Sequence, residues 1–430
     1  MSARDGSTSS FITARDSSTS SFYTARSTSR SSYVFRAIES FSQTRVQKNS
    51  DWYNHLRIRG LLPNEFDEKN WSGRGQHVEY ELHEAAAIPL QAKSVLGFSA
   101  MALVESVQCR RILLARKTIK CGRQIKREDA ITEVEHLQRL RHYHLIQVIG
   151  SYVMARDLAI LLYPVAEYNL ETFMDSIVDA QPAIGRKIAS LCFFFGCLSN
   201  ALEYLHCKNT KHLDIKPKNI LVRDLTSSQW NSGDQPVRYN VYIADFGIAR
   251  SYSSSDACET DTPTSFTRTY SAPEVVLQEK RGLGADVFSL GCVFLEMIAI
   301  IVSHWTRTDE LQKLKDVRKN NVDGDTSYQA NVRSMRDWLQ KIQTQHYDSL
   351  VFAFTNPGHF HPFADFIEPA MIDVHLPSNA TLLSLLPKML DPDPGLRPST
   401  TKILDLTYHL CCPKCKTGPE PLEANGVFPA

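Results

Sequence analysis

The chain has 430 residues, of which 43 % are hydrophobic and 22 % are charged, and its formal net charge is +1. This composition is typical of soluble globular proteins, and the length allows one large domain or two of ordinary size. The balanced charge gives no reason to expect nucleic acid or another highly charged partner.

The first segment, residues 1–45, is an imperfect repeat. Ala3-Arg4-Asp5 returns as Ala14-Arg15-Asp16 and in part as Ala25-Arg26-Ser27. Each unit has too few apolar residues for a coiled-coil seam, so the Ser/Thr/Arg-rich composition predicts a disordered tail. Its excess of arginine leaves weak binding to an anionic surface open, although a solvated tail that phosphorylation tunes is the simpler interpretation.

A lead-in segment, residues 46–87, connects this tail to a globular domain at residues 88–410. In the lead-in, Val78–Leu82 alternates with period two, as a half-buried strand does. Within the domain, strands are predicted first and helices later. This order predicts a β-rich N-lobe at 88–163, an α-rich C-lobe at 169–410 and a loose tail at 411–430. The predicted strands are Lys93–Leu96, Met101–Val107 and Ile112–Ile119, and the clearest helices are Arg127–Arg141 and Ile188–His206.

A lysine and a glutamate in the N-lobe form a candidate ion pair. Lys117 ends an apolar strand, and Glu133 shares one helical face with Leu137 and Leu140. An acid on an apolar face is costly to bury alone, and a lysine from a neighbouring strand would satisfy it. That lysine would then point at the α- and β-phosphates of a nucleotide. The alternative is an ordinary surface lysine at a strand end.

The segment His212-Leu-Asp-Ile-Lys-Pro-Lys-Asn219 carries the strongest chemical signal. Asp214 can accept or orient a hydroxyl proton, Lys216 can neutralise a transferring phosphate, and Asn219 offers an amide oxygen to Mg²⁺. Asp245 in Asp245-Phe-Gly247 follows a predicted strand and supplies a carboxylate to the same metal. Ordinary turn residues are the alternative for both segments.

Three later residues indicate structural support. Glu274 in Ala272-Pro-Glu274 and Arg397 near the end of the domain look like a buried ion pair, and Asp286 looks like a brace for the backbone of the 212–219 loop.

These motifs, in this order, resemble the signature set of the eukaryotic protein kinase family over roughly residues 88–410. The resemblance implies a two-lobed α+β kinase fold, ATP and Mg²⁺ as cofactors, and protein substrates. Lys216 and Thr267 resemble the serine/threonine branch, and the catalytic loop is similar to that of a group of fungal kinases. The implied catalytic residues are Lys117, Glu133, Asp214 and Lys216, the implied metal ligands are Asn219 and Asp245, and the implied nucleotide-binding residues are Gly97, Ser99, Val104, Ala115, Lys117, Tyr163, Ala166 and Leu221, with a hinge at Tyr163–Tyr168.

Two departures from the family pattern matter. The Gly-rich loop keeps only Gly97, so we expect weaker or slower ATP binding. Leu213 stands where the family usually has an arginine that meets an activation-loop phosphate, which predicts activity without that phosphate. Both departures leave a pseudokinase scaffold as the alternative, although every charged group that the chemistry needs is present. A small-molecule kinase is disfavoured by the Ala-Pro-Glu motif and its arginine.

The remaining features predict less specific structure. Insertions near 226–237 and 306–329 are expected to be solvated loops, with binding of a partner as the alternative for either. The 10 cysteines form no regular framework, which favours reduced thiols in a cytoplasmic or nuclear protein, and no signal peptide is recognised. Cys412 and Cys415 form a C-x-x-C, but no second pair lies nearby, so we do not expect zinc there; His142 and His144 are expected to pack or be solvated. The apolar run Val287–Val302 is shorter than the roughly 20 residues of a membrane span and contains Glu296, so a buried helix is expected.

Overall fold

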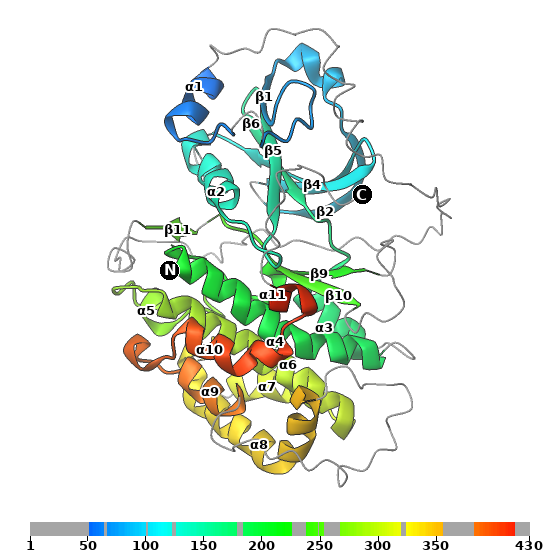
Figure 1. The fold of residues 1–430 in the computed structure, drawn as a ribbon. Coiled ribbons are helices and arrows are strands. Elements are labelled where there is room, and N and C mark those ends of the chain that lie inside the picture. Colours follow the sequence, from blue (N-terminus) through cyan, green and yellow to red (C-terminus); the bar gives the residue numbers. More distant parts are fainter. Residues whose placement is uncertain are drawn as a thin grey trace.

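The computed structural model describes residues 51–63, 67–99, 102–122, 126–178, 184–225, 238–247, 249–252, 267–319, 324–355 and 382–417. The N-terminal repeats and the insertion at 226–237 lie outside the described residues. A β-sheet lobe sits above a larger helical lobe (Figure 1). This arrangement confirms the predicted two-lobed α+β architecture.

One six-stranded sheet forms the small lobe, in the order β1-β5-β6-β4-β3-β2. Neighbouring strands are antiparallel except β1, which pairs in parallel with β5. Helix α2 (Arg127–Arg139) packs on one face through Ile131 and Val134, both fully buried. The expected strands are present. The strand predicted at Lys93–Leu96 has eight residues, the next runs from 102 to 109, and the third extends one residue beyond Ile119. The strands are β1 His77–Tyr80, β2 Gln91–Phe98, β3 Ala102–Cys109, β4 Ile112–Lys120, β5 Gln147–Met154 and β6 Asp157–Tyr163.

The lead-in segment belongs to this lobe. Trp71, Val78 and Tyr80 join an apolar cluster with side chains of β3 to β6. Helix α1 (Asp51–Ile58), which the sequence did not predict, is followed by a turn that contacts α2. There, Gln138 Nε2 donates to the carbonyl of Leu61 at 2.8 Å. The lead-in therefore supplies a strand to the sheet and a support for α2.

The large lobe is built around two long apolar helices, α4 and α6. Both are long and apolar enough to cross a membrane, but 83 % and 100 % of their apolar windows are buried inside the protein. The apolar run Val287–Val302 was expected to be shorter than a membrane span, but it belongs to α6, which has 23 residues. The predicted burial of this run is observed. The elements of this lobe are β7 Tyr168–Asn169, α3 Leu170–Val178, α4 Ile184–Cys207, β8 Thr210–Lys211, β9 Ile220–Asp224, β10 Tyr239–Ile243, β11 Arg250–Ser251, α5 Pro273–Val276, α6 Gly284–Thr306, α7 Glu310–Lys319, α8 Val332–Thr355, α9 Leu382–Met389, α10 Thr400–Thr407 and α11 Pro413–Thr417, with short 3₁₀ turns at Pro217–Asn219, Gln329–Asn331, Pro394–Leu396 and Tyr408–Leu410. A further 3₁₀ turn, Leu82–Ala87, lies in the small lobe between β1 and β2.

Two expectations for loops are wrong. The insertion at 306–329 contains α7, whose Leu311 and Leu314 are buried, and it continues to the fully buried Tyr328. These leucines are three residues apart and share one face of the helix, a spacing that indicates a buried face. The many charged residues around them made this spacing easy to overlook in the sequence. The expected tail likewise starts too early, because Cys411, Cys412 and Cys415 are buried against the large lobe.

Candidate active site

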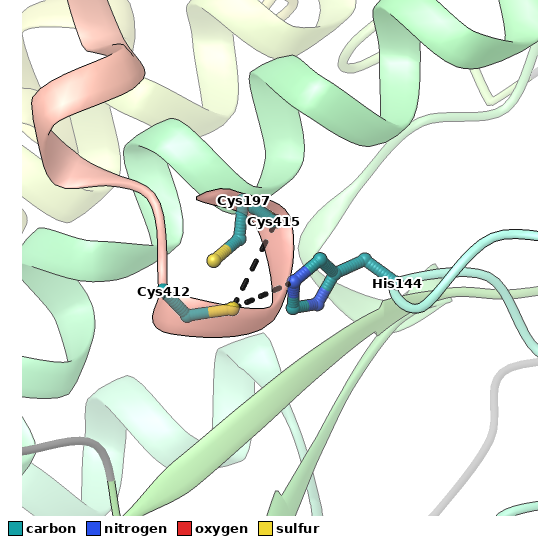
Figure 2. A group of neighbouring side chains, drawn as sticks. All are labelled: His144, Cys197, Cys412 and Cys415. Atoms are coloured by element: carbon teal, nitrogen blue, oxygen red, sulfur yellow. Dashed lines mark hydrogen bonds between the residues drawn. The ribbon is translucent and has the colours of Figure 1, made fainter. Parts of the chain in front are cut away.

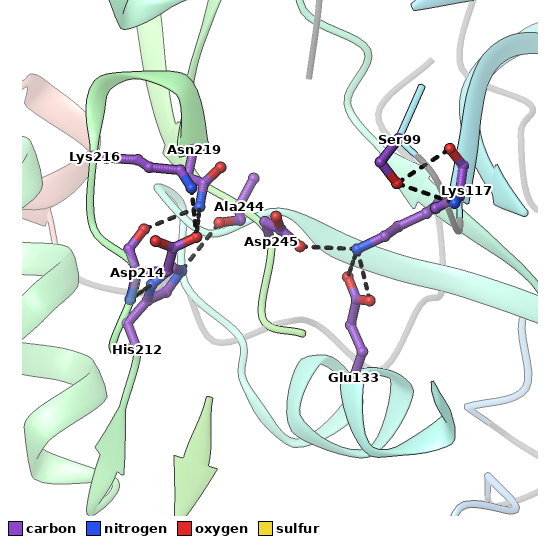
Figure 3. Close-up of polar contacts among 10 residues, drawn as sticks. Ser99, Lys117, Glu133, His212, Asp214, Lys216, Asn219, Ala244 and Asp245 are labelled. Atoms are coloured by element: carbon purple, nitrogen blue, oxygen red, sulfur yellow. Dashed lines mark hydrogen bonds and ion pairs between the residues drawn. The ribbon is translucent and has the colours of Figure 1, made fainter. Parts of the chain in front are cut away.

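Lys117 is the centre of the first cluster in the site. Its Nζ lies 3.0 and 2.8 Å from the two carboxylate oxygens of Glu133 and 2.8 Å from Oδ1 of Asp245 (Figure 3). Strand β4 carries the lysine, α2 carries the glutamate, and Asp245 follows β10. Burial alone would lower the pKa of Lys117, but the carboxylates of Asp245 and Glu133 outweigh it and raise the pKa, so the amine stays protonated.

Asp214 is the centre of the second cluster. Lys216 Nζ lies 2.8 Å and Asn219 Nδ2 lies 2.7 Å from its Oδ2, while the hydroxyl of Thr267 donates to its Oδ1 at 2.7 Å (Figure 3 shows the first three residues). Lys216 also donates to Thr267 at 2.7 Å. The 212–219 loop and the start of the 267–275 segment therefore meet at one carboxylate.

Asp286, at the start of α6, holds the backbone of the 212–219 loop. Its two carboxylate oxygens accept the backbone N–H groups of His212 at 2.8 Å and Leu213 at 2.7 Å. Leu213 has a φ of +65°, in the left-handed region that costs a leucine energy. Burial would raise the pKa of Asp286, but hydrogen bonds from His206 and from the loop lower it, so the brace stays ionised.

An apolar pocket lies beside Lys117, between the two lobes. Ala115, Ala166 and Leu221, which the sequence assigned to the nucleotide, line it together with five further residues: Leu96, Ile146, Leu162, Pro164 and Val165. Pro164 and Val165 belong to the predicted hinge. Leu96, Ile146 and Leu162 were missed, because an apolar residue in a strand gives no local sign of facing a cleft.

The other five residues assigned to the nucleotide do not line this pocket: Gly97, Ser99, Val104, Lys117 and Tyr163. Val104 is buried on β3, where it pairs with Lys117 on one side and Gly97 on the other. Ser99 closes the β2–β3 turn, since its Oγ accepts the N–H of Ala102 at 3.0 Å. The hydroxyl of Tyr163 accepts a hydrogen bond from Arg223 at 3.0 Å, so its ring is engaged with β9.

Comparison with known proteins agrees with this geometry. A family profile described as "Protein kinase domain" matches residues 91–409. The chain belongs to the protein kinase family. Cyclin-dependent kinase E-1 of Arabidopsis thaliana is 26 % identical over 318 residues, which cover 70 % of this chain and 61 % of the relative.

Two other relatives match over shorter stretches. Cyclin-dependent kinase 4 of Xenopus laevis is 33 % identical over 176 residues, covering 39 % of this kinase and 49 % of the relative. Serine/threonine-protein kinase ULK3 of Homo sapiens is 26 % identical over 257 residues, covering 59 % of this kinase and 48 % of the relative. This kinase thus spans between 48 % and 61 % of the length of these relatives.

The residues of the kinase fit the Mg²⁺ that the family implies. Asn219 donates through Nδ2 to the carboxylate and main-chain oxygen of Asp214, while its own Oδ1 is buried with no hydrogen-bond partner among the described residues. A buried acceptor without a partner is costly unless something binds it. An amide oxygen together with the carboxylate of Asp245 is a donor set that Mg²⁺ prefers.

The segment after Thr267 is fixed by a buried acid. Glu296 on α6 accepts the hydroxyls of Tyr270 at 2.9 Å and Tyr328 at 2.6 Å, and the N–H of Tyr328 donates to the carbonyl of Thr269 at 2.9 Å. Burial raises the pKa of Glu296, and the hydroxyl of Tyr328 is the largest influence that opposes this rise. We call Tyr270, Glu296 and Tyr328 the tyrosine clamp. It connects the 306–329 insertion to the segment that reaches Asp214.

The remaining predicted pair is also formed. Arg397 places its two terminal nitrogens 2.6 and 2.8 Å from the two carboxylate oxygens of Glu274, and both residues are buried. This bidentate pair joins α5 to the end of the large lobe.

Proposed function

We propose that this kinase transfers the γ-phosphate of Mg-ATP to serine and threonine hydroxyls of protein substrates. The observation that carries the proposal is the complete set of paired charges around Lys117 and Asp214. A chain that had lost catalysis would have no need to hold Lys117 between two buried carboxylates, because burying three charged groups is costly.

Each charged residue has a defined task in this reaction. Lys117, held by Glu133, would bind the α- and β-phosphates. Asp214 would orient the acceptor hydroxyl and take its proton, and Lys216 would stabilise charge on the transferring group. Asn219 and Asp245 would hold Mg²⁺, which would neutralise negative charge on the phosphate groups of ATP.

The preference for serine and threonine rests on Thr267. Its hydroxyl bonds both Asp214 and Lys216, which fixes the segment close to the loop that receives the substrate hydroxyl. Serine/threonine-protein kinase ULK3 of Homo sapiens, whose name gives this acceptor class, supports the same choice.

We also propose that the kinase needs no phosphate on the 267–270 segment. Leu213 is an apolar, buried residue and offers no charge to a phosphate. The tyrosine clamp fixes the same segment through neutral hydroxyls and a buried acid.

The alternative is a pseudokinase scaffold, favoured by the loss of glycines after Gly97. Transfer of labelled γ-phosphate from Mg-ATP to a generic basic protein, compared with Asp245→Asn, separates the two. Transfer by the wild type alone, with the label on serine or threonine, supports the proposal. Folded wild-type protein whose melting temperature rises with Mg-ATP but which transfers no phosphate would establish the scaffold.

A further inference from the structure

Outside the active site, one cluster gathers four metal-binding side chains. His144, Cys197, Cys412 and Cys415 each offer one ligand atom, and these atoms all lie within 4.8 Å of one another. All four residues are buried. They come from three distant parts of the chain: the loop between α2 and β5, the middle of α4, and the C-terminal segment around α11 (Figure 2).

The distances between the ligand atoms match a tetrahedral zinc site. With Zn–S bonds of about 2.3 Å and a Zn–N bond of about 2.0 Å, a regular tetrahedron places two sulfurs ~3.8 Å apart and a sulfur and a nitrogen ~3.5 Å apart. Cys412 Sγ lies 3.8 Å from Cys415 Sγ and 3.3 Å from His144 Nε2. The sulfurs are free thiols, much farther apart than in a disulfide, whose S–S length is about 2.05 Å.

The orientation of His144 gives independent support. Its Nδ1 lies 2.7 Å from the main-chain oxygen of Val241, which only accepts, so Nδ1 carries the proton and Nε2 turns its lone pair toward the cysteines. Histidines that bind zinc typically donate their other N–H to a carbonyl or carboxylate in this way.

The C-terminal segment is also fitted closely to α4. A Cβ on Gly196 would lie 2.5 Å from the backbone nitrogen of Cys411 and 2.5 Å from the carbonyl carbon of Leu410, so only glycine permits this approach. The next residue along α4 is Cys197. The backbone contact thus brings Cys412 and Cys415 to the helix position that carries the third cysteine.

We propose that His144, Cys197, Cys412 and Cys415 bind one structural Zn²⁺. Three cysteines and one histidine form a closed coordination sphere, which is typical of structural rather than catalytic zinc. On binding, the three thiols release their protons to solvent and coordinate as thiolates. The sequence-based expectation of no zinc rested on the absence of a second nearby pair. The fold removes that ground, because it brings His144 and Cys197 to the C-x-x-C from far along the chain.

The site would link the two lobes. The carbonyl of His144 accepts the N–H of Ile243 at 2.8 Å, and Ile146 donates to the carbonyl of Ile243 at 3.0 Å. Ile243 ends β10 and is followed closely by Asp245. Zinc would therefore fix the loop after α2, the strand before Asp245 and the C-terminal segment to one helix.

The test is the metal content of the full-length wild-type protein, purified without chelator. We expect about one zinc per chain by mass spectrometry, as a single four-ligand site requires. Replacement of the metal with Co²⁺ should give a thiolate-to-cobalt charge-transfer band and the intense visible bands of tetrahedral cobalt. Chelation should lower the melting temperature, and added Zn²⁺ should restore it.

Cys197→Ala and its matched control Cys192→Ala distinguish a ligand from a core cysteine. Both cysteines are buried in α4, but Cys192 is outside the cluster. Only Cys197→Ala should lose zinc and the cobalt charge-transfer band. If a variant fails to fold, the metal content and the cobalt spectrum of the wild-type protein still show whether the chain binds zinc through thiolates. Wild-type protein without zinc and without a cobalt–thiolate band overturns the proposal, as does a Cys412–Cys415 disulfide found in the freshly purified protein.

Discussion

Asp286→Asn tests whether the brace under the catalytic loop sets its active shape. The wild-type carboxylate is 1 % exposed and accepts two backbone N–H groups, one of which belongs to Leu213 with its φ of +65°. Asparagine has nearly the same shape but only one acceptor oxygen. One backbone N–H then faces an amide NH₂ group, and the loop loses half of the contact that holds Leu213 in the left-handed region.

The size of the effect follows from two costs. A buried donor left without an acceptor costs about 1–3 kcal/mol, and a leucine in the left-handed region costs about 1–2 kcal/mol. The loop can avoid both by moving, and such movement displaces Asp214. A bias of ~1–3 kcal/mol against the active loop corresponds to a loss of about 5- to 150-fold in kcat. The KM for ATP should change less, because Asp286 holds the 212–219 loop, whereas Lys117 and the residues that line the apolar pocket lie outside that loop.

Leu213→Gly tests whether the strained backbone of Leu213 contributes to the loss of kcat, since glycine adopts the left-handed region without the energetic cost that leucine has there. In the Asp286→Asn background it should recover part of kcat, with a coupling of about 1–2 kcal/mol between the two substitutions. The assay is kcat at saturating ATP and substrate, with melting temperatures for all variants. Asp316→Asn, which changes an exposed carboxylate on α7, is the control and should alter neither quantity. Wild-type kcat in Asp286→Asn, or strictly additive losses in the double variant, would refute the reasoning.

Three further predictions concern single contacts. Glu133→Gln removes one of the two carboxylates on Lys117 and should lower kcat about 10- to 100-fold while the protein stays folded; unchanged kcat would contradict the role of this pair. Phosphatase-treated kinase, verified by mass spectrometry, should keep kcat within about twofold, because Leu213 cannot bind a phosphate; a collapse would show that a phosphate is required. Burial lowers the pKa of His77 from 6.5 to about 4, so the stability that its neutral form contributes is present above pH 6.5 and is lost as pH falls toward 4. His77→Gln should therefore flatten the fall in melting temperature across this range, and equal falls in both proteins would count against it.

The residues of the active site could be predicted because local sequence carries them. Asp214, Lys216 and Asn219 lie within one loop, so their proximity needs no knowledge of the fold. The pairing of Lys117 with Glu133 required one physical step, since an acid on an apolar helix face needs a partner. Both arrangements are present in the structure.

Features that depend on distant contacts were not accessible in this way. The parallel pairing of β1 with β5 brings the lead-in to a sheet edge that no local pattern specifies. The cluster around Cys197 needs three segments whose proximity is set by the packing of the lobes. An isolated histidine, a core cysteine and a C-x-x-C pair each have an ordinary explanation, and only their convergence distinguishes them.

The contacts of the lead-in and the C-terminal segment also define the cooperative folding unit of this kinase. The family match begins at residue 91 and ends at residue 409. Outside it, Trp71, Val78 and Tyr80 cover apolar side chains of the sheet, and Cys412 and Cys415 lie beside Cys197 of α4. A fragment cut at the limits of the match would expose these apolar surfaces and lose two of the four clustered ligands. A stretch that keeps these contacts must reach from Trp71 to Cys415, so it extends beyond both ends of the core that this kinase shares with its relatives.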